Sequence, residues 1–502
     1  MKTPSPCGPA RRTPLAACLT LAFCFPAPLV CAAAGDHPSG RLIAGTGSSH
    51  PGARPGAARA HLARARPAVA RPPMTVPVTS CADDGSPGTL RAVVAGASSG
   101  DTVDMSQLTC GTITLTTGQI NVYVDDLTLR GPGQNALTID ANHASRVIAT
   151  YGLGLTLYDL TVANGYQTGP GYGGCIYSYL YRPDNPTTLA RVTVDRCTAI
   201  AAAGAPFAVG GGVLAFGSLT LDASTLSNNT VTAPDGTQIV GGGAYVSYGV
   251  HITNSTVSGN AATRSTPGSD RFALGGGIET ALTDSGSVIT GTTMSNNMAD
   301  DFGAALFLYI VSSGGSTRVM HVANSTLSGN ASGSGTGIEI DSGPDAPFYL
   351  SLASSTIAFN TFTRDPGCGG VAQAGYTASI VDLESTIIAN NTGPGDVEYD
   401  ACAADGTSSM IGANNLIMVS ELPVPPGTIT DDPMLGPLQD NGGPTLTHAL
   451  LPGSPAIDTG NNVAGLEFDQ RGAGFARSVG AAPDIGAYEV QSDVIFANGF
   501  DP

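Results

Sequence analysis

The sequence predicts an all-β protein that folds as a right-handed parallel β-helix with a cap at each end. Three observations predict this fold: a motif that recurs at intervals of about 30 to 37 residues, Gly-rich turns between short apolar segments, and a charged fraction of only 12%. A fixed period of this size indicates stacked repeats, in which each repeat buries its apolar face against its neighbours. We therefore expect one elongated core and little helix.

The recurring motif is a Ser/Thr-rich segment that ends in Asn. It reads STLSNN, STVSGN, TTMSNN, STLSGN, STIAFN and STIIAN, and it ends at Asn229, Asn260, Asn297, Asn330, Asn360 and Asn390. Looser copies place Gly165 and Cys197 in the same column. Asn tolerates left-handed turn geometry, and its amide can hydrogen-bond the next amide in a stack. The motif therefore predicts a structural column of Asn side chains.

Each repeat is expected to supply three short strands. In the copy at 250–260, Val250 and Ile252 alternate with polar residues, and a bend at Asn254 starts a second strand with Val257 pointing inward. A Gly triplet begins the third strand in GGGVLAF, GGGAYVSY and GGGIETAL. The triplets predict tight corners, because no helix with Lys and Ser/Thr follows them as in a phosphate-binding loop. The residues after each Asn turn are predicted to form a loop.

The residues before the repeats predict export. Lys2, Arg11 and Arg12 precede an apolar run and then a segment of small residues, which is the order found in a secretory signal peptide. A stretch rich in Ala, Pro and Arg follows and predicts a disordered linker. We therefore expect a secreted or cell-surface protein of a bacterium with no transmembrane span in its mature chain. The expected parts are a signal peptide at 1–34, a linker at 35–80, an N-terminal cap with the first coils at 81–130, β-helix repeats at 131–410, a C-terminal cap at 411–490 and a tail at 491–502.

Charge and cysteine content restrict the partners and the redox state. The formal net charge is −18, and the acidic excess lies in the expected folded part, which argues against a nucleic-acid partner. Such acidity allows Ca²⁺ binding, but without a tight Asp ligand loop we assign no cofactor and no metal site. An even set of cysteines remains beyond the signal peptide and predicts disulfides in an exported chain. The expected pairs are Cys81 with Cys110, Cys175 with Cys197, and Cys368 with Cys402.

Both ends of the expected folded part carry familiar patterns. CADDGSPGTLRAVVAGASSGDTV at 81–103 resembles the N-terminal cap of secreted bacterial β-helix proteins, in which a short helix, here around Leu90 to Ala97, plugs the open end. DPMLGPLQDNGGPTLTHALLPGSPAIDTG at 432–460, with DQRG and DIGAYE further on, resembles the choice-of-anchor Q domain. The resemblance implies an exported β-helix protein and no agreed activity. It also implies that polar residues cap the last coil, namely Asp440, Asp458, Asp469, Arg471, Asp484 and Glu489.

The outward face of the strand after the Gly triplet is the predicted ligand-binding site. Residues next to the inward Ile176, Val213, Ala244, Ile278, Leu306 and Ile338 should form an outward column in which aromatic rings stand beside carboxylates. Sugar rings stack on aromatic side chains, and their hydroxyls bind to acids, so this strip suits a polysaccharide or another surface partner. The alternative is that the loops after the Asn turns fold back and bury it. The predicted binding residues are Tyr177, Tyr179, Phe216, Tyr245, Glu279, Phe307, Tyr309, Glu339 and Asp341.

The sequence supports a catalytic site less well than it supports a binding site. Polygalacturonases and pectate lyases use parallel β-helices, but of the polygalacturonase pattern only Asp300-Asp301 is present here. Glu279 and Glu339 are the candidate catalytic residues, because two coils place them roughly 9.6 Å apart, near the carboxylate separation of inverting glycosidases. We therefore expect a non-catalytic binding or adhesion module, with a polysaccharide lyase or glycoside hydrolase as the first alternative and a structural stalk as the second.

Overall fold

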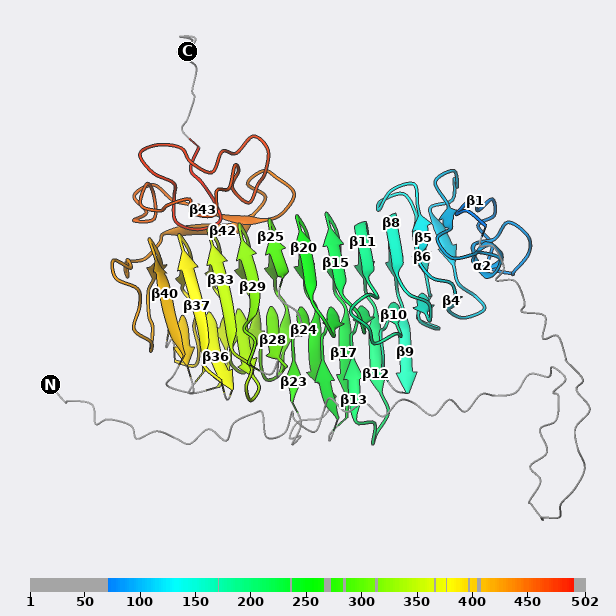
Figure 1. Cartoon of the computed structure of the whole chain (residues 1–502), viewed down its shortest axis with the longest axis horizontal. Helices are drawn as coiled ribbons and strands as arrows, with labels where there is room; N and C mark the ends of the chain where they lie inside the picture. The colour runs from blue at the N-terminus through cyan, green and yellow to red at the C-terminus, as the bar shows by residue number, and fades with distance from the viewer. Residues whose placement is uncertain are drawn as a thin grey trace, which may run out of the picture.

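The computed structural model describes residues 71–491, apart from 170, 235–236, 266–271, 283–285, 312–314, 365–366, 376, 396–397 and 404–407. The described chain is a parallel β-solenoid, as the repeat predicts, in which each strand pairs with the equivalent strand of the next coil (Figure 1). The predicted signal peptide, most of the linker and most of the tail lie outside the described residues. None of the described helices is long and apolar enough to cross a membrane.

Two long sheets form the body of the solenoid. The ten-stranded sheet contributes one strand to each coil and consists of β4 (Ile120–Val122), β7 (Ile148–Thr150), β10 (Ile176–Ser178), β14 (Val213–Ala215), β19 (Ala244–Val246), β24 (Ile278–Leu282), β28 (Leu306–Ile310), β32 (Ile338–Ser342), β36 (Val371–Gly375) and β39 (Ala401–Ala403). The 21-stranded sheet consists of β1 (Thr75–Pro77), β2 (Thr102–Asp104), β3 (Thr112–Thr114), β5 (Leu127–Arg130), β6 (Thr138–Asp140), β8 (Leu155–Ala163), β11 (Thr187–Asp195), β15 (Leu219–Asp222), β16 (Thr225–Ser227), β20 (Val250–Thr253), β21 (Thr256–Ser258), β25 (Ser287–Thr290), β26 (Thr293–Ser295), β29 (Arg318–Ala323), β30 (Thr326–Ser328), β33 (Phe348–Ala353), β34 (Thr356–Ala358), β37 (Ser379–Glu384), β38 (Ile387–Ala389), β40 (Ser409–Ala413) and β41 (Leu416–Ile417).

The segments after the Asn turns form two smaller parallel sheets. The seven-stranded sheet consists of β9 (Tyr166–Gly169), β12 (Thr198–Ala201), β17 (Thr230–Ala233), β22 (Ala261–Arg264), β27 (Met298–Ala299), β31 (Ala331–Ser332) and β35 (Thr361–Phe362). The three-stranded sheet consists of β13 (Phe207–Val209), β18 (Gln238–Val240) and β23 (Ala273–Leu274). Small side chains such as Ala199, Ala208 and Ala262 form an apolar layer shared by the two sheets. These segments are therefore ordered strands where the sequence predicted loops.

The predicted bend and the predicted Asn column are both present. Asn254 adopts φ 47° between β20 and β21, which returns Val257 to the core. Along the column, each Asn Nδ2 donates to the Oδ1 of the next Asn, for example from Asn297 to Asn330 (3.0 Å) and from Asn330 to Asn360 (2.8 Å). The column therefore runs as a continuous chain of side-chain amides, which we call the Asn ladder.

The structure corrects two details of the Asn ladder. Its last amide belongs to Asn391 and not to Asn390, because Asn360 Nδ2 donates to Asn391 Oδ1 (2.8 Å). The left-handed conformation also belongs to the residue before the ladder Asn, such as Gly259 (φ 65°) or Asn390 (φ 59°). The ladder Asn itself is held by its amide bonds.

All three predicted disulfides are present: Cys81–Cys110, Cys175–Cys197 and Cys368–Cys402. The short helix predicted near the N-terminal end is α2 (Leu90–Ala95), and the Thr89 hydroxyl caps it by accepting from Ala92 N (3.3 Å). Leu90 and Val94 are buried in the solenoid core. The helix therefore packs at the first coils, close to the position that the sequence indicated.

The C-terminal segment lies along the side of the solenoid (Figure 1). It contains a hairpin, β42 (Leu435–Gln439) and β43 (Thr447–Leu450). Its contacts reach several coils: Thr293 Oγ1 donates to Leu446 O (2.6 Å), Thr326 Oγ1 donates to Gln470 Oε1 (2.6 Å), and Ser385 Oγ donates to Asn461 O (2.9 Å). The segment thus covers the flank of several coils, whereas the resemblance implied a cap on the last one.

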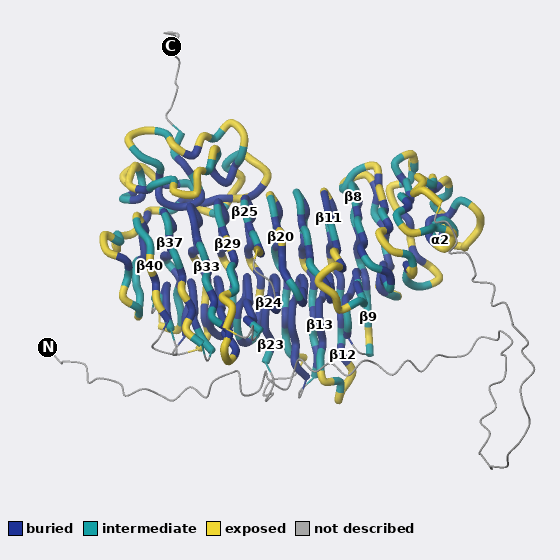
Figure 2. The backbone as a smooth tube through the Cα atoms, viewed as in Figure 1, coloured by how far each residue is buried: buried dark blue, intermediate teal, exposed yellow. Residues whose placement is uncertain are grey.

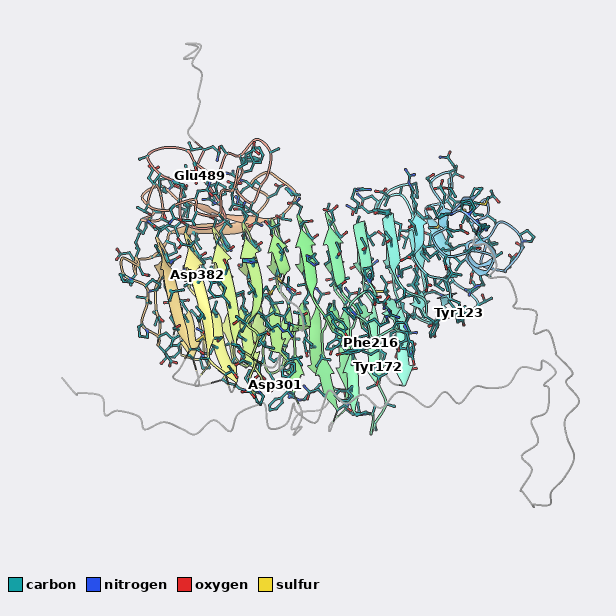
Figure 3. All side chains as sticks on the ribbon, in the orientation of Figure 1. Tyr123, Tyr172, Phe216, Asp301, Asp382 and Glu489 are labelled. Atoms are coloured by element: carbon teal, nitrogen blue, oxygen red, sulfur yellow. A yellow bond between two sulfur atoms is a disulfide. The ribbon has the colours of Figure 1, made fainter. Side chains whose placement is uncertain are left out.

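Buried ion pairs hold the C-terminal segment together. The Arg471 guanidinium bonds to Asp469 and lies between the rings of Phe475 (3.9 Å) and Tyr488 (3.8 Å). Arg477 pairs with Glu489 at 3.0 Å, and Glu489 is one of the labelled side chains of Figure 3. Four polar side chains, of which Asp469, Arg471 and Glu489 are among those that the resemblance singled out, therefore form two ion pairs within this segment.

Candidate functional site

The predicted direction of the side chains in the ten-stranded sheet is confirmed. Ile176, Ile278 and Leu306 belong to the main core, and the residues beside them point outward. The strand register aligns the expected outward column, in the order Tyr177, Leu214, Tyr245, Glu279, Phe307 and Glu339.

The expected exposure of this column is wrong in its C-terminal half. Tyr245 is only 2% exposed, Phe307 0% and Tyr309 4%, and the nearby Glu279, Glu339 and Asp341 are also buried. The cause is a second apolar cluster outside the main core, in which Val209, Val240 and Leu274 of the three-stranded sheet join Leu214, Tyr245 and Phe307. The segments after the Asn turns thus fold back over the strip, and Figure 2 shows these strands as buried.

Carboxyl oxygens of two acids in this covered region have no hydrogen-bond partner. Oε2 of Glu279 and both carboxyl oxygens of Asp341 bond to no side chain or backbone group in the described chain. Burial raises the pKa of Asp341 to about 7. Burial, and then the nearby Asp341, raise the pKa of Glu279 well above its usual range. The environment of Glu279 therefore favours its neutral form.

The tyrosines beside these acids respond to the same environment. Burial raises the pKa of Tyr309 to about 12, with smaller contributions from Asp341 and Glu279. Burial and the nearby Glu279 also raise the pKa of Tyr245. Tyr245, Glu279, Tyr309, Glu339 and Asp341 thus form one cluster, which we call the buried acid cluster. Burial in this cluster favours the neutral forms of Glu279, Asp341 and the two tyrosines.

The N-terminal half of the same sheet carries a continuous row of aromatic rings that solvent reaches. Ring centroids lie 5.2 Å apart for Tyr123 and Tyr151, 5.8 Å for Tyr151 and Tyr179, and 5.9 Å for Tyr177 and Tyr179. The row continues through Phe216 to Tyr181 (6.1 Å) and from Tyr181 to Tyr248 (5.2 Å). We call this set the aromatic ladder; it consists of Tyr123, Tyr151, Tyr177, Tyr179, Tyr181, Phe216 and Tyr248.

The coil repeat positions the rings of the aromatic ladder. Tyr123, Tyr151 and Tyr179 each stand three residues after paired Ile residues of β4, β7 and β10, so they share one outward column. Tyr123 is 72% exposed and Tyr181 52% exposed, while Phe216 is largely covered. Tyr123 and Phe216 are labelled in Figure 3. The sequence-based prediction includes Tyr177, Tyr179 and Phe216. It lacks Tyr123 and Tyr151 because no Gly triplet precedes β4 or β7, and it lacks Tyr181 and Tyr248 because they lie beyond the ends of β10 and β19.

A buried arginine fixes the centre of the aromatic ladder. The Arg146 guanidinium lies over the Tyr177 ring (4.9 Å) and donates to Gly173 O (2.7 Å), Tyr172 O (2.5 Å) and Gln119 Oε1 (2.5 Å). Burial lowers the pKa of Arg146 to about 10, so it keeps its charge at neutral pH. Arg146 thus holds Tyr177 from one side, while Tyr179 and Phe216 make edge contacts with the same ring.

The acidic pair Asp300-Asp301 is structural. The buried Asp301 accepts from Ala273 N (2.8 Å) and pairs with Arg264 and Arg364, so it joins three coils (Figure 3). In the described residues no three His, Cys, Asp or Glu side chains are grouped as metal ligands.

Comparison with known proteins leaves the family open. No family model matches the chain, and no curated protein matches it. Among solved structures, the crystal structure of pectate lyase Pel9A is similar, with a TM-score of 0.42 and 14% sequence identity, over 83% of this chain and 96% of that one. A likeness at this level carries no conclusion about the site.

Proposed function

We propose that this protein binds a polysaccharide along the aromatic ladder, as an exported bacterial protein that acts at the cell envelope or outside the cell. The observation that supports this proposal is the continuous row of rings from Tyr123 to Tyr248. Solvent-accessible aromatic rings in a soluble protein mark binding surfaces, since they gain free energy when another apolar face covers them.

The geometry of the aromatic ladder suits an extended chain. It spans the five coils from β4 to β19, which is about 19 Å at about 4.8 Å per coil. The apolar faces of successive sugar rings can stack on successive tyrosines, and the phenol hydroxyls can bind the sugar hydroxyls. The protein is strongly acidic, with a net charge of −18, so an uncharged glycan is favoured over a polyanion.

The proposal is tested by binding measurements on a panel of glucan, mannan, xylan and polygalacturonate. We expect binding to a neutral glycan, and Tyr151→Ala should weaken it by about 1 to 2 kcal/mol through loss of one stacked ring. Tyr158→Ala is the matched control, because Tyr158 is a half-buried tyrosine of the 21-stranded sheet. Equal loss in both variants, or no binding by the unaltered protein, would refute the proposal.

A lyase or glycoside hydrolase is the second candidate, and it requires a substrate to reach the buried acid cluster, which the segments after the Asn turns cover. A carboxylic acid with a pKa near 7, such as Asp341, suits general acid catalysis at neutral pH. The sequence paired Glu279 with Glu339, while the pKa shifts couple Glu279 to Asp341. If the protein cleaves its ligand, Glu279→Gln and Asp341→Asn should abolish release of reducing ends or unsaturated products and preserve affinity. Full activity in both variants would exclude these roles.

The expected chain boundaries belong to the same proposal. We propose a signal peptide at 1–34, a linker that starts at 35 and a choice-of-anchor Q-like domain at 411–490. The predicted end of the linker at residue 80 is wrong, because β1 (Thr75–Pro77) pairs with β2 and Val78 is buried in the core. The three disulfides support export, because such bonds persist in oxidising compartments. N-terminal sequencing of the exported protein tests the first boundary. A mature chain that retains Met1 would contradict it.

A further inference from the structure

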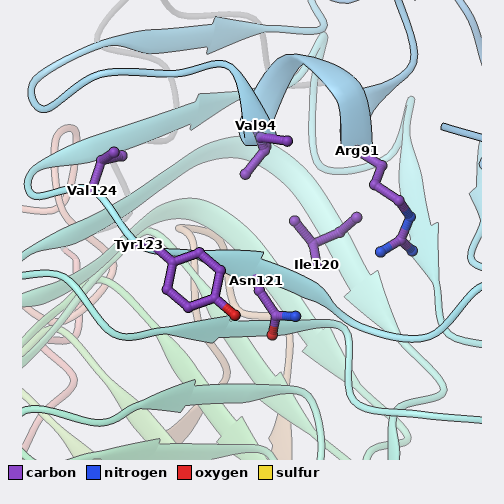
Figure 4. A pocket seen from close by; sticks show the side chains of 7 residues that line it. Arg91, Val94, Ile120, Asn121, Tyr123 and Val124 are labelled. Atoms are coloured by element: carbon purple, nitrogen blue, oxygen red, sulfur yellow. The ribbon is translucent and has the colours of Figure 1, made fainter. Parts of the chain in front are cut away.

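A cavity opens at the N-terminal end of the aromatic ladder. It has a volume of about 400 Å³ and lies between α2 and β4 (Figure 4). Val94 and Ala95 of α2 line one side, and Ile120 and Val124 line the other. Tyr123 also lines it, and the same ring stacks on Tyr151 with an interplanar angle of 14°. The cavity and the aromatic ladder therefore share a wall.

The polar residues of the cavity are largely committed to other partners. Arg91 donates to both carboxyl oxygens of Asp83 and to the carbonyls of Gly118 (2.6 Å) and Gln119 (2.9 Å), so it presents mainly its aliphatic stem. The Asn121 Oδ1 accepts from Gln119 Nε2 (2.7 Å). A cavity of this volume with apolar walls and a few polar groups suits a small uncharged ligand group and offers no free charge for an anion.

We infer that this cavity is the end subsite of the aromatic ladder, and that it takes the terminal sugar of an uncharged glycan through a methyl-sized apolar substituent. The inference rests on the proposed function, since it needs a glycan on the aromatic ladder. Val94 and Ile120 are buried in the core, so the part of the apolar lining that a ligand can contact is Ala95, Val124 and the Tyr123 ring, and a methyl group packed against these residues is removed from water. Burying one such group corresponds to about fourfold tighter binding. A 6-deoxy methyl and an O-acetyl methyl share this chemistry.

The test uses hexaoses of β-linked glucose and mannose in three forms: unmodified, with a terminal O-acetyl group, and with a terminal 6-deoxy residue. We expect at least one modified form to bind the unaltered protein about fourfold more tightly than the unmodified hexaose. The form that gains identifies the substituent. Ala95→Phe, which fills the cavity, should abolish this gain. Ala95→Leu fills the cavity only in part and should reduce the gain, and it serves as the test if Ala95→Phe does not fold. Ala82→Phe, at an exposed alanine outside the cavity, should retain it.

Two results would overturn the inference in distinguishable ways. Equal affinity for all three forms, together with a general loss in Tyr151→Ala, would remove the end subsite and leave binding on the aromatic ladder intact. No binding of any hexaose or polysaccharide to the unaltered protein would remove the proposed function and the subsite with it. A gain that survives in both Ala95→Phe and Ala95→Leu would place the substituent outside the cavity.

Discussion

Removal of one amide from the Asn ladder should destabilise the solenoid far more than removal of an exposed Asn. Asn330 is fully buried, and its side chain makes four hydrogen bonds. Its Oδ1 accepts from Asn297 N (2.9 Å) and Asn297 Nδ2 (3.0 Å), while its Nδ2 donates to Met294 O (3.1 Å) and Asn360 Oδ1 (2.8 Å). At about 1 kcal/mol per bond, Asn330→Ala should lower the free energy of unfolding by about 3 to 4 kcal/mol.

The assay is urea denaturation followed by circular dichroism, with Asn135→Ala as the control because Asn135 lies exposed in a turn. Asn330→Asp provides a second comparison, since a carboxylate can replace Oδ1 but cannot donate to Met294 O or Asn360 Oδ1. We expect Asn330→Asp to be destabilised at pH 8 and partly restored at low pH, where the protonated acid donates again. If Asn330→Ala and Asn135→Ala differ by less than about 0.5 kcal/mol, the amide bonds contribute no net stability and the reasoning is wrong.

Three further predictions concern other parts of the chain. Burial raises the pKa of Asp341 to about 7, so the folded state holds this proton more tightly than the unfolded state. The free energy of unfolding should therefore fall as the pH rises from about 4 to about 7. Asp341→Asn should flatten that fall in denaturation curves recorded across this range. Replacement of Cys368 and Cys402 by Ser should lower the free energy of unfolding by about 3 to 4 kcal/mol, because the bond closes a loop with a sequence separation of 34 residues. An unchanged denaturation midpoint would show that this disulfide does not stabilise the fold. Arg471→Lys should loosen the C-terminal segment, because Lys can neither bond to both Asp469 oxygens nor stack between two rings; limited proteolysis of the variant and of the exposed-site control Arg182→Lys should show faster cleavage only in the former.

The fold could be predicted because every coil repeats the same local constraints. The bend at Asn254, the inward Val257 and the Asn ladder all follow from short motifs, and stacking brings equivalent residues together. The prediction of the column is wrong only where the motif allows two alignments. In STIIANN the ladder residue is Asn391, because Ser385 takes the left-handed bend (φ 50°) and Thr386 starts the motif.

The state of the candidate site could not be predicted in the same way. Exposure of an outward side chain depends on what covers it, and the segments after the Asn turns vary in length from coil to coil. They cover Tyr245 and Phe307 with a three-stranded sheet, but they leave Tyr123 and Tyr181 in solvent. Alternation along a strand gives the direction of a side chain and says nothing about its cover.

The Asn ladder also has a direction and a defined end. Between ladder side chains, each Nδ2 donates to the next residue toward the C-terminus. The last one, Asn391, donates its backbone N–H (3.2 Å) and its Nδ2 (2.7 Å) to Asp400 Oδ1, while the other oxygen of Asp400 accepts from Val419 N (3.0 Å). Burial raises the pKa of Asp400 to about 7, and both of its oxygens accept hydrogen bonds here, so the series ends at this carboxyl group. Gain or loss of a whole coil upstream of those that the C-terminal segment contacts would leave this terminator and those contacts intact. Duplication of a repeat there can therefore change the length of the solenoid without rebuilding either end.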